Sequence, residues 1–215
     1  MTKELHYFNL NGLAESIRYI LHYTKQKFED VRYDRSAWPN KEVKDSLPYG
    51  QLPVYKHGDR ILHQSLAIAK YVAQGTELIP IDPWEQAVLE SIVHTIYDFW
   101  LGKTYFQYLN FKEKYCYMKS TRLTLMESID FFFSRLEKRL KENGGFFTGK
   151  LTWAEFVLVG IVEASNTFLG IELEKKYPLV ATIVEKIRNL PGVKEYIETR
   201  GPYPLRSDGL ENRKD

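Results

Sequence analysis

The chain has 215 residues, with 30 basic and 28 acidic side chains, so its net charge at neutral pH is only +2. This near balance gives no electrostatic reason to expect binding to nucleic acid or to a membrane surface. A single cysteine, Cys116, excludes an intrachain disulfide and is typical of a reducing compartment. Residues 1–4 lack the apolar core of a signal peptide, and the apolar run 156–162 is too short to span a bilayer. We therefore expect a soluble, cytoplasmic protein.

The first third of the chain alternates short strands with helices. The apolar pattern predicts strand, helix, strand, strand, strand and helix, in that order, over residues 3–8, 13–24, 28–33, 53–57, 60–63 and 65–74. A hairpin signal, His57-Gly58-Asp59, joins the last two strands. A β-α-β unit followed by β-β-α describes a thioredoxin-like α/β domain, which we place at residues 1–74. The domain has no Cys-x-x-Cys motif, so dithiol redox chemistry is excluded.

A linker and two long helices are expected next. Glycine and proline mark the linker at residues 75–83, and a proline is acceptable in the first turn of a helix that begins at Pro83. This helix is expected to reach about residue 110. A second is expected over 119–143, where Gly144-Gly145 stops it.

A third helix is predicted to form the buried centre of the C-terminal part. Thr152 and Glu155 have the spacing of a capping box that opens it. Apolar residues then occur on all sides of the helix, so it should be enclosed by its neighbours. The remaining expected ranges are 173–189 and 191–199 for two shorter helices, 84–205 for the all-α domain as a whole, and 206–215 for a polar tail.

Two positions are candidate ligand contacts, and each also has an ordinary structural explanation. Ser65 precedes an apolar-periodic run as a helix N-cap, where free backbone N–H groups and a hydroxyl attract a carboxylate. Taken alone, Ser65 is better explained as an ordinary cap. At Leu52-Pro53 a cis peptide bond costs only about 0.5–1 kcal/mol, and a trans proline that opens an edge strand is the alternative.

Tyr7, a candidate catalytic residue, stands near the end of the first predicted strand, where a tyrosine that faces a thiol-bearing ligand can donate its O–H to the sulfur. Its position alone is weak evidence for this role. A thiol with a pKa of about 8.5 is mostly protonated at neutral pH, and the thiolate is the nucleophile. A hydroxyl that donates a hydrogen bond to the thiolate lowers the pKa of that thiol. The alternative is a core tyrosine, since the chain has 15 tyrosines.

Three segments together resemble the glutathione-binding half of the cytosolic glutathione transferases. They are Tyr7, Tyr49-Gly50-Gln51-Leu52-Pro53-Val54 and Gln64-Ser65-Leu66-Ala67-Ile68-Ala69-Lys70-Tyr71. The two-domain layout of that family covers essentially the whole chain. The residues around these segments are most similar to the sigma class, whereas the spacing from Trp38 to Lys44 matches the pi class.

The resemblance implies that glutathione is the co-substrate and favours a cis bond before Pro53. The implied contacts are Tyr7 to the sulfur, Leu52 to the cysteinyl backbone, Trp38 and Lys44 to the glycyl carboxylate, Gln51, Gln64 and Ser65 to the γ-glutamyl end, and Asp98 of the partner subunit to the α-amino group. Lys41 is a rival for the role of Lys44. For Asp98 the alternative is a solvated helix carboxylate.

The resemblance also implies a hydrophobic pocket and a homodimer. The implied electrophile pocket contains Phe8, Leu13, Gly102, Tyr105 and Tyr108. An aromatic stripe at helical spacing is more often core, so a packing role for these tyrosines stays open. Tyr49 matches the aromatic residue that inserts into the neighbouring subunit in some classes.

Two residues depart from the family pattern. Relatives usually carry an arginine near the sulfur where Leu13 stands, and leucine cannot stabilise a thiolate in that way. Tyr97 replaces one of the paired aspartates of vertebrate prostaglandin D synthases, so we expect no metal site at the subunit interface.

The leading interpretation is a glutathione transferase that joins the thiolate of glutathione to small hydrophobic electrophiles in detoxification. The first alternative is a glutathione-dependent isomerase of the prostaglandin D synthase kind, against which Leu13 and Tyr97 argue. The second is a non-catalytic ligand carrier or crystallin-like protein. Retention of Tyr7, Gln64 and Ser65 argues against that role, because a purely structural protein does not need them.

Overall fold

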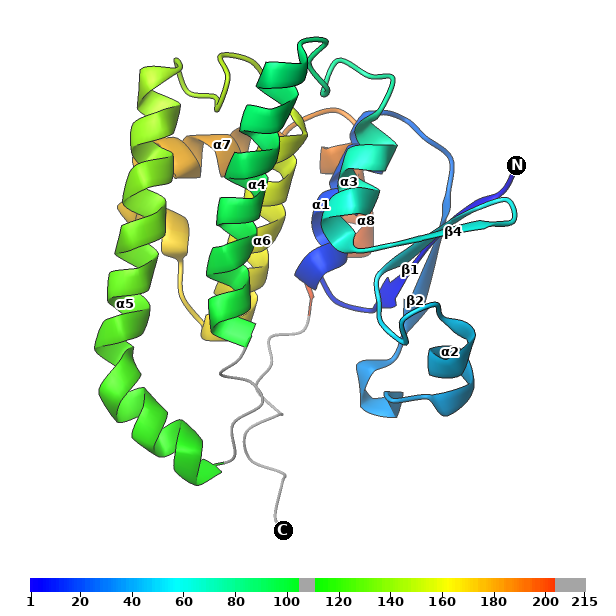
Figure 1. Ribbon diagram of the computed structural model, residues 1–215, viewed down its shortest axis with the longest axis horizontal. Helices are drawn as coiled ribbons and strands as arrows, with labels where there is room; N and C mark the ends of the chain where they lie inside the picture. The colour runs from blue at the N-terminus through cyan, green and yellow to red at the C-terminus, as the bar shows by residue number, and fades with distance from the viewer. Residues whose placement is uncertain (105–110, 204–215) are drawn as a thin grey trace.

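The chain folds into a part that contains a sheet and a part made of helices, which pack side by side (Figure 1). The computed structural model describes residues 1–104 and 111–203, with the backbone alone for 102–104 and 111–125. Among the helices of these residues, none combines the length and the apolar character that a membrane span requires.

The sheet is mixed and has four strands in the order β2-β1-β3-β4. The strands are β1 Lys3–Phe8, β2 Glu29–Tyr33, β3 Val54–His57 and β4 Arg60–His63. Strand β1 pairs in parallel with β2, whereas β3 runs antiparallel to both β1 and β4. This is the pairing of the predicted β-α-β and β-β-α halves, so the predicted thioredoxin-like order is confirmed. The central position of β1 carries Tyr7 to the end of the sheet, opposite Arg32 of β2.

Two helices lie between the sheet and the helical part (Figure 1). They are α1 Glu15–Tyr23, which follows a 3-10 turn, η1 Gly12–Ala14, and α3 Ser65–Ala73. Their apolar faces enter one continuous core with the strands and with the helices beyond. Both helices lie within the ranges predicted for them.

The segment between β2 and β3, for which no helix or strand was predicted, contains helical turns. The turns are η2 Arg35–Ala37 and α2 Lys41–Ser46. The side chain of Asp34 accepts the N–H of Ser36 at 2.8 Å, and that of Asn40 accepts the N–H of Val43 at 3.1 Å. These local caps stabilise turns too short to show an apolar period.

The helical part differs from the predicted ranges in three places. Its elements are α4 Pro83–Thr104, α5 Phe111–Glu142, α6 Trp153–Leu169, η4 Leu173–Lys176, α7 Pro178–Arg188 and α8 Val193–Arg200. Helix α5 begins eight residues before the expected residue 119, in a stretch without glycine or proline to prevent it. The single helix expected over 173–189 is divided before Pro178, because proline has no N–H to continue a helix and suits a first turn. The last helix begins and ends slightly later than the predicted 191–199.

Helix α6 is the buried centre of the helical part, as predicted. The capping box is present. Glu155 accepts the backbone N–H of Thr152 at 2.8 Å, and the Thr152 side chain accepts the backbone N–H of Ala154. Helix α6 packs against α1 so closely that a Cβ on Gly160 would lie 2.9 Å from the backbone nitrogen of Ser16. The two parts of the chain are therefore held face to face by helix backbones in near contact.

Candidate active site

Tyr7 lies near the end of β1 with its side chain 6% exposed. Its hydroxyl accepts a hydrogen bond from the backbone N–H of Leu13 at 3.1 Å. Between them, Gly12 adopts φ +49°, and a Cβ there would lie 2.6 Å from the Tyr7 hydroxyl oxygen. The turn after β1 thus packs tightly around the Tyr7 phenol. Because the hydroxyl oxygen accepts the Leu13 N–H, the hydroxyl proton of Tyr7 is free to be donated to another group.

Burial raises the pKa of Tyr7 above its ordinary value of 10.0. The hydrogen bond from Leu13 acts in the opposite direction, as do the guanidinium groups of Arg18 and Arg35, but burial prevails. The phenol is therefore protonated at neutral pH. In this state it can act as a hydrogen-bond donor and not as a base.

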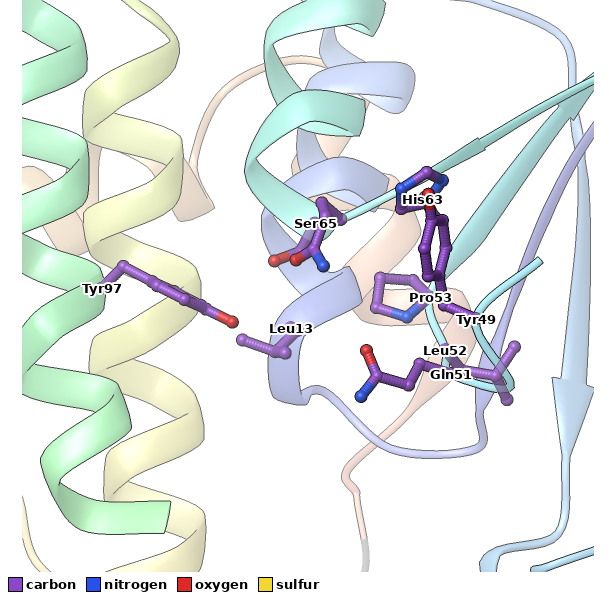
Figure 2. A pocket seen from close by; sticks show the side chains of 9 residues that line it. Leu13, Tyr49, Gln51, Leu52, Pro53, His63, Ser65 and Tyr97 are labelled. Carbon is purple, nitrogen blue, oxygen red and sulfur yellow. The ribbon is translucent and has the colours of Figure 1, made fainter. Parts of the chain in front are cut away.

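A pocket opens beside the end of the sheet, and α4 faces it from the helical part (Figure 2). Its lining residues are Leu13, Tyr49, Gln51, Leu52, Pro53, His63, Gln64, Ser65 and Tyr97. Five of the residues predicted to contact ligand are thus brought together, from three separate segments: Leu13, Gln51, Leu52, Gln64 and Ser65. Their side chains supply amide groups, a hydroxyl group and apolar surface to the same pocket.

The start of α3 differs from the prediction. Gln64 and not Ser65 is the N-cap, with no capping hydrogen bond from its side chain. Gln64 has φ +71°, a backbone conformation that non-glycine residues rarely adopt. This conformation turns the chain sharply out of β4, so Ser65 already lies inside the helix and is buried. Strain of this kind gathers at functional sites, and here it places an exposed amide and the helix N-terminus at the pocket.

The peptide bond between Leu52 and Pro53 is cis, as the resemblance favours. Pro53 is buried and opens β3, while Leu52 is half-buried at the edge of the pocket. A second cis bond, between Trp38 and Pro39, was not predicted.

Tyr97 is a pocket residue that was not predicted to contact ligand. It extends from α4 with its hydroxyl toward Leu13 (Figure 2). Burial raises the pKa of Tyr97, and the hydroxyl of Ser65 acts against that rise, so the two hydroxyl groups are neighbours. In the sequence this residue resembles any half-buried helix tyrosine. Its replacement of a family aspartate was the one signal that could have indicated a place in the site.

Tyr49 and His63 also line the pocket without having been predicted to bind ligand. Their rings lie 4.2 Å apart between centroids, at the outer side of the pocket (Figure 2). Tyr49 is 66% exposed, so one side of its ring is free to contact another molecule.

Four predicted glutathione contacts lie outside this pocket lining. Tyr7 is one of them, although its hydroxyl accepts the backbone N–H of the lining residue Leu13. Trp38 is half-buried and packs edge-on against Phe8, with ring centroids 5.3 Å apart. Lys44 is exposed, and its stem packs next to Gly50, where an added Cβ would lie 3.2 Å from it. Asp98 is exposed on α4.

The predicted electrophile pocket is described only in part. Phe8 is half-buried between Tyr7 and Trp38, with 5.3 Å from its ring centroid to each of theirs. Gly102 belongs to the last turn of α4, whereas Tyr105 and Tyr108 fall outside the described residues. Within the described part of the chain, no three His, Cys, Asp or Glu residues gather closely enough to hold a metal ion.

Two family patterns cover most of the chain. Residues 3–74 match the glutathione S-transferase N-terminal domain, and residues 103–200 match the glutathione S-transferase C-terminal domain. The chain belongs to the glutathione S-transferase family, and its relatives place it near the sigma class. The fold is accordingly the one predicted, a thioredoxin-like domain followed by a helical domain.

Relatives of this kind match nearly the full chain. Glutathione S-transferase S1 of Drosophila melanogaster is 35% identical over 199 residues, which are 91% of this chain and 78% of that protein. The hematopoietic prostaglandin D synthase of Homo sapiens is 32% identical over 210 residues, 92% of this chain and 96% of that protein. Among solved structures, prostaglandin synthase D of Nilaparvata lugens matches with a TM-score of 0.86 and 32% identity, over 95% of this chain and 100% of that one.

Proposed function

We propose that this chain conjugates glutathione to small hydrophobic electrophiles, with Tyr7 as the catalytic residue. The observation that carries the proposal is the Tyr7 phenol, held by the Leu13 N–H and kept protonated by burial beside the pocket. The donated hydrogen bond stabilises the thiolate relative to the thiol. The sulfur then attacks the electrophile, so the nucleophile belongs to glutathione and the protein needs only to position and ionise it.

The groups around the pocket suit the rest of the tripeptide. Gln64 and Ser65 at the start of α3 offer an amide, a hydroxyl and free backbone N–H groups to the γ-glutamyl carboxylate. Gln51 and Leu52 lie in the same pocket, and the backbone of Leu52 would pair with the cysteinyl residue. Trp38 and Lys44 would bind the glycyl carboxylate from the segment between β2 and β3.

The electrophile would bind on the side of the pocket that faces α4. Leu13 supplies apolar surface there, and Phe8, Gly102, Tyr105 and Tyr108 are proposed to extend it. With leucine in place of the arginine usual in relatives, thiolate stabilisation rests mainly on Tyr7. Leu13→Arg should therefore lower the pKa of the thiol of bound glutathione further. It should also reduce the affinity for apolar electrophiles.

We further propose that the protein is a homodimer in the cytoplasm. In each chain, residues 1–74 form the domain that binds glutathione, residues 84–205 form the helical domain, and residues 75–83 link the two. Asp98 is exposed on α4, and Tyr49 is exposed on its loop. In the proposed dimer, Asp98 reaches the ligand's α-amino group in the other subunit, and Tyr49 inserts between subunits.

A second candidate is glutathione-dependent isomerisation of prostaglandin H to prostaglandin D. It is favoured by relatives named prostaglandin D synthase at 32 to 33% identity over 92% of the chain. Leu13 and Tyr97, which both line the pocket, stand against it. Leu13 replaces the arginine usual near the sulfur, and Tyr97 replaces one of the paired aspartates of vertebrate prostaglandin D synthases. A carrier that binds glutathione without turnover is the third candidate.

One set of assays separates these functions. Conjugation of glutathione to 1-chloro-2,4-dinitrobenzene, isomerisation of prostaglandin H, and binding of S-hexylglutathione should be measured on the same preparation. The transferase proposal predicts binding and conjugation, with little isomerisation. Isomerisation without conjugation would favour the second candidate, and binding without either rate would indicate a carrier.

A further inference from the structure

A cluster of buried and half-buried charged and phenolic side chains lies directly behind the turn that holds Tyr7. We call it the Arg18 cluster; its members are Glu15, Arg18, Asp30, Tyr196, Arg200 and Tyr203. Glu15 and Arg18 are completely buried, and they pair with each other at 3.1 Å. Arg18 also bonds Asp30 at 3.0 Å. Buried charges are kept only where partners satisfy them, so each partner in this cluster matters to its neighbours.

Arg18 fixes the backbone of the turn after β1. Its guanidinium donates to the carbonyl of Leu10 at 2.7 Å and to that of Phe8 at 3.3 Å. These two carbonyls lie between Tyr7 and Leu13, the residue whose N–H holds the phenol. The guanidinium also lies 5.9 Å from the centre of the Tyr7 ring. A shift of Arg18 would therefore move the Tyr7 hydroxyl together with its donor.

Glu15 holds Arg18 in place and is itself held from the far end of the chain. Beyond the ion pair with Arg18, it pairs with Arg200 at 3.0 Å. It also accepts hydrogen bonds from the hydroxyl of Tyr203 at 2.8 Å and from that of Tyr196 at 3.3 Å. The shortest of these hydrogen bonds to Glu15 comes from Tyr203, which lies three residues beyond α8.

Tyr203 joins both charges of the pair. Its hydroxyl donates to Glu15 and accepts from Arg18 at 3.3 Å, and its ring lies 4.4 Å from the guanidinium carbon of Arg200. Burial and the Glu15 carboxylate raise the pKa of Tyr203, so the phenol keeps the proton that it donates. Tyr203 itself does not line the pocket described above.

We propose that Tyr203 is a positioning residue for thiol activation: through Glu15 and Arg18 it fixes the Phe8–Leu13 turn, and so the Tyr7 hydroxyl. The proposal rests on the function proposed above. It assigns to the segment after α8 a part in the chemistry at the opposite end of the chain. No contact between Tyr203 and substrate is needed.

The test is Tyr203→Phe, which removes one oxygen and keeps the ring. We expect kcat for conjugation to fall by roughly tenfold or more, because small displacements of a catalytic group are costly. We expect the KM for glutathione to stay within about twofold, since the peptide contacts are untouched. The pH profile of the rate should move upward, because a displaced Tyr7 hydroxyl stabilises the thiolate less.

The matched control is Tyr177→Phe. Tyr177 is also buried and donates its hydroxyl to a carboxylate, Asp130, but in the helical part away from the pocket. Both variants should lose some thermal stability, and only Tyr203→Phe should shift the pH profile. Equal pH profiles for wild type and Tyr203→Phe would overturn the proposal, as would equal shifts in the two variants.

Two further measurements keep the test decisive. Tyr203→His keeps a ring with an N–H donor; it should recover part of the lost rate, and it replaces Tyr203→Phe if that variant does not fold. Hydrogen exchange of the Leu13 amide should be faster in Tyr203→Phe than in Tyr177→Phe. If wild type has no conjugation rate but this exchange difference is found, the function proposed above fails while the positioning role stands. If wild type is active and exchange at Leu13 is unchanged, the positioning role fails alone.

Discussion

The position of the Tyr7 hydroxyl is fixed by close contacts with individual neighbouring residues. The phenol is enclosed by the Leu13 N–H on one side and by the backbone of Gly12 on the other. The remaining hydrogen-bonding capacity of the hydroxyl is its proton, so activity should depend on the position of one oxygen atom.

Gly12→Ala should separate this steric constraint from general backbone strain. A Cβ at position 12 would lie 2.6 Å from the Tyr7 hydroxyl oxygen and would force the phenol to move. Gly75→Ala is the control, since Gly75 also has a positive φ but meets nothing within 4 Å. Alanine in a left-handed conformation costs about 1–2 kcal/mol in either place. We expect Gly75→Ala to lose only the stability that this strain costs and to keep its activity. Gly12→Ala should lose more stability, because the clash adds to the strain, and should lose most conjugation activity.

The residues of the pocket were predictable to different degrees. Gln51, Leu52, Gln64 and Ser65 lie in two short segments with a recognisable pattern, so their grouping could be expected. Tyr97 could not be assigned in this way, because a helix tyrosine has no local feature that says whether it faces a core or a pocket. Its place depends on how α4 packs beside the sheet-containing part.

At the scale of elements, apolar periodicity and punctuation by glycine and proline predicted most of the fold. The errors have local physical causes: Asp34 and Asn40 cap turns too short to show periodicity, and Pro178 divides a run that periodicity alone joins. The N-cap of α3 was predicted at Ser65, whereas it is Gln64, whose backbone has a positive φ. Propensity does not predict such a conformation, because the surrounding structure imposes it.

The capping box of α6 should be a stability element. The Thr152 hydroxyl donates to Glu155 at 2.6 Å, both side chains are fully buried, and Glu155 also accepts the N–H of Phe147 at 2.8 Å. Thr152→Ala should lower the free energy of unfolding by about 0.5–2 kcal/mol, toward the upper end because a buried carboxylate loses a donor. Thr182→Ala, at an exposed helix position, is the control and should change it little. Chemical denaturation measures both; equal midpoints for Thr152→Ala and wild type would contradict a capping role.

At the scale of the molecule, the two parts of the chain are joined by the packing of α1 on α6 and by the Arg18 cluster. The second link brings together Glu15 and Tyr203, which are 188 residues apart in the sequence. No periodicity or motif indicates such a pair. Long-range polar networks are therefore the feature of this fold that a single sequence predicts least well.

The proposed role of Asp98 can be tested with mixed dimers. If Asp98 acts in the other subunit, Asp98→Ala should raise the KM for glutathione by about tenfold, because a hydrogen bond to a charged group is lost. A dimer of one Tyr7→Phe chain and one Asp98→Ala chain then contains one intact site, so it should have about half of wild-type activity. If Asp98 acts within its own chain, or not at all on the ligand, that mixed dimer should be no more active than the average of its parents.

The most direct test of the central claim is the pH dependence of glutathione conjugation in wild type and in Tyr7→Phe, with S-hexylglutathione binding as the check on folding. The raised pKa of Tyr7 keeps its proton in place across neutral pH, so the wild-type rate should rise through the pKa of the bound thiol, below about 8.5, and should not fall again before about pH 9. Tyr7→Phe should bind normally, lose roughly ten- to hundredfold in rate at neutral pH, and have its profile displaced toward the free-thiol value. A Tyr7→Phe variant with the wild-type rate and profile would show that Tyr7 does not activate the thiol.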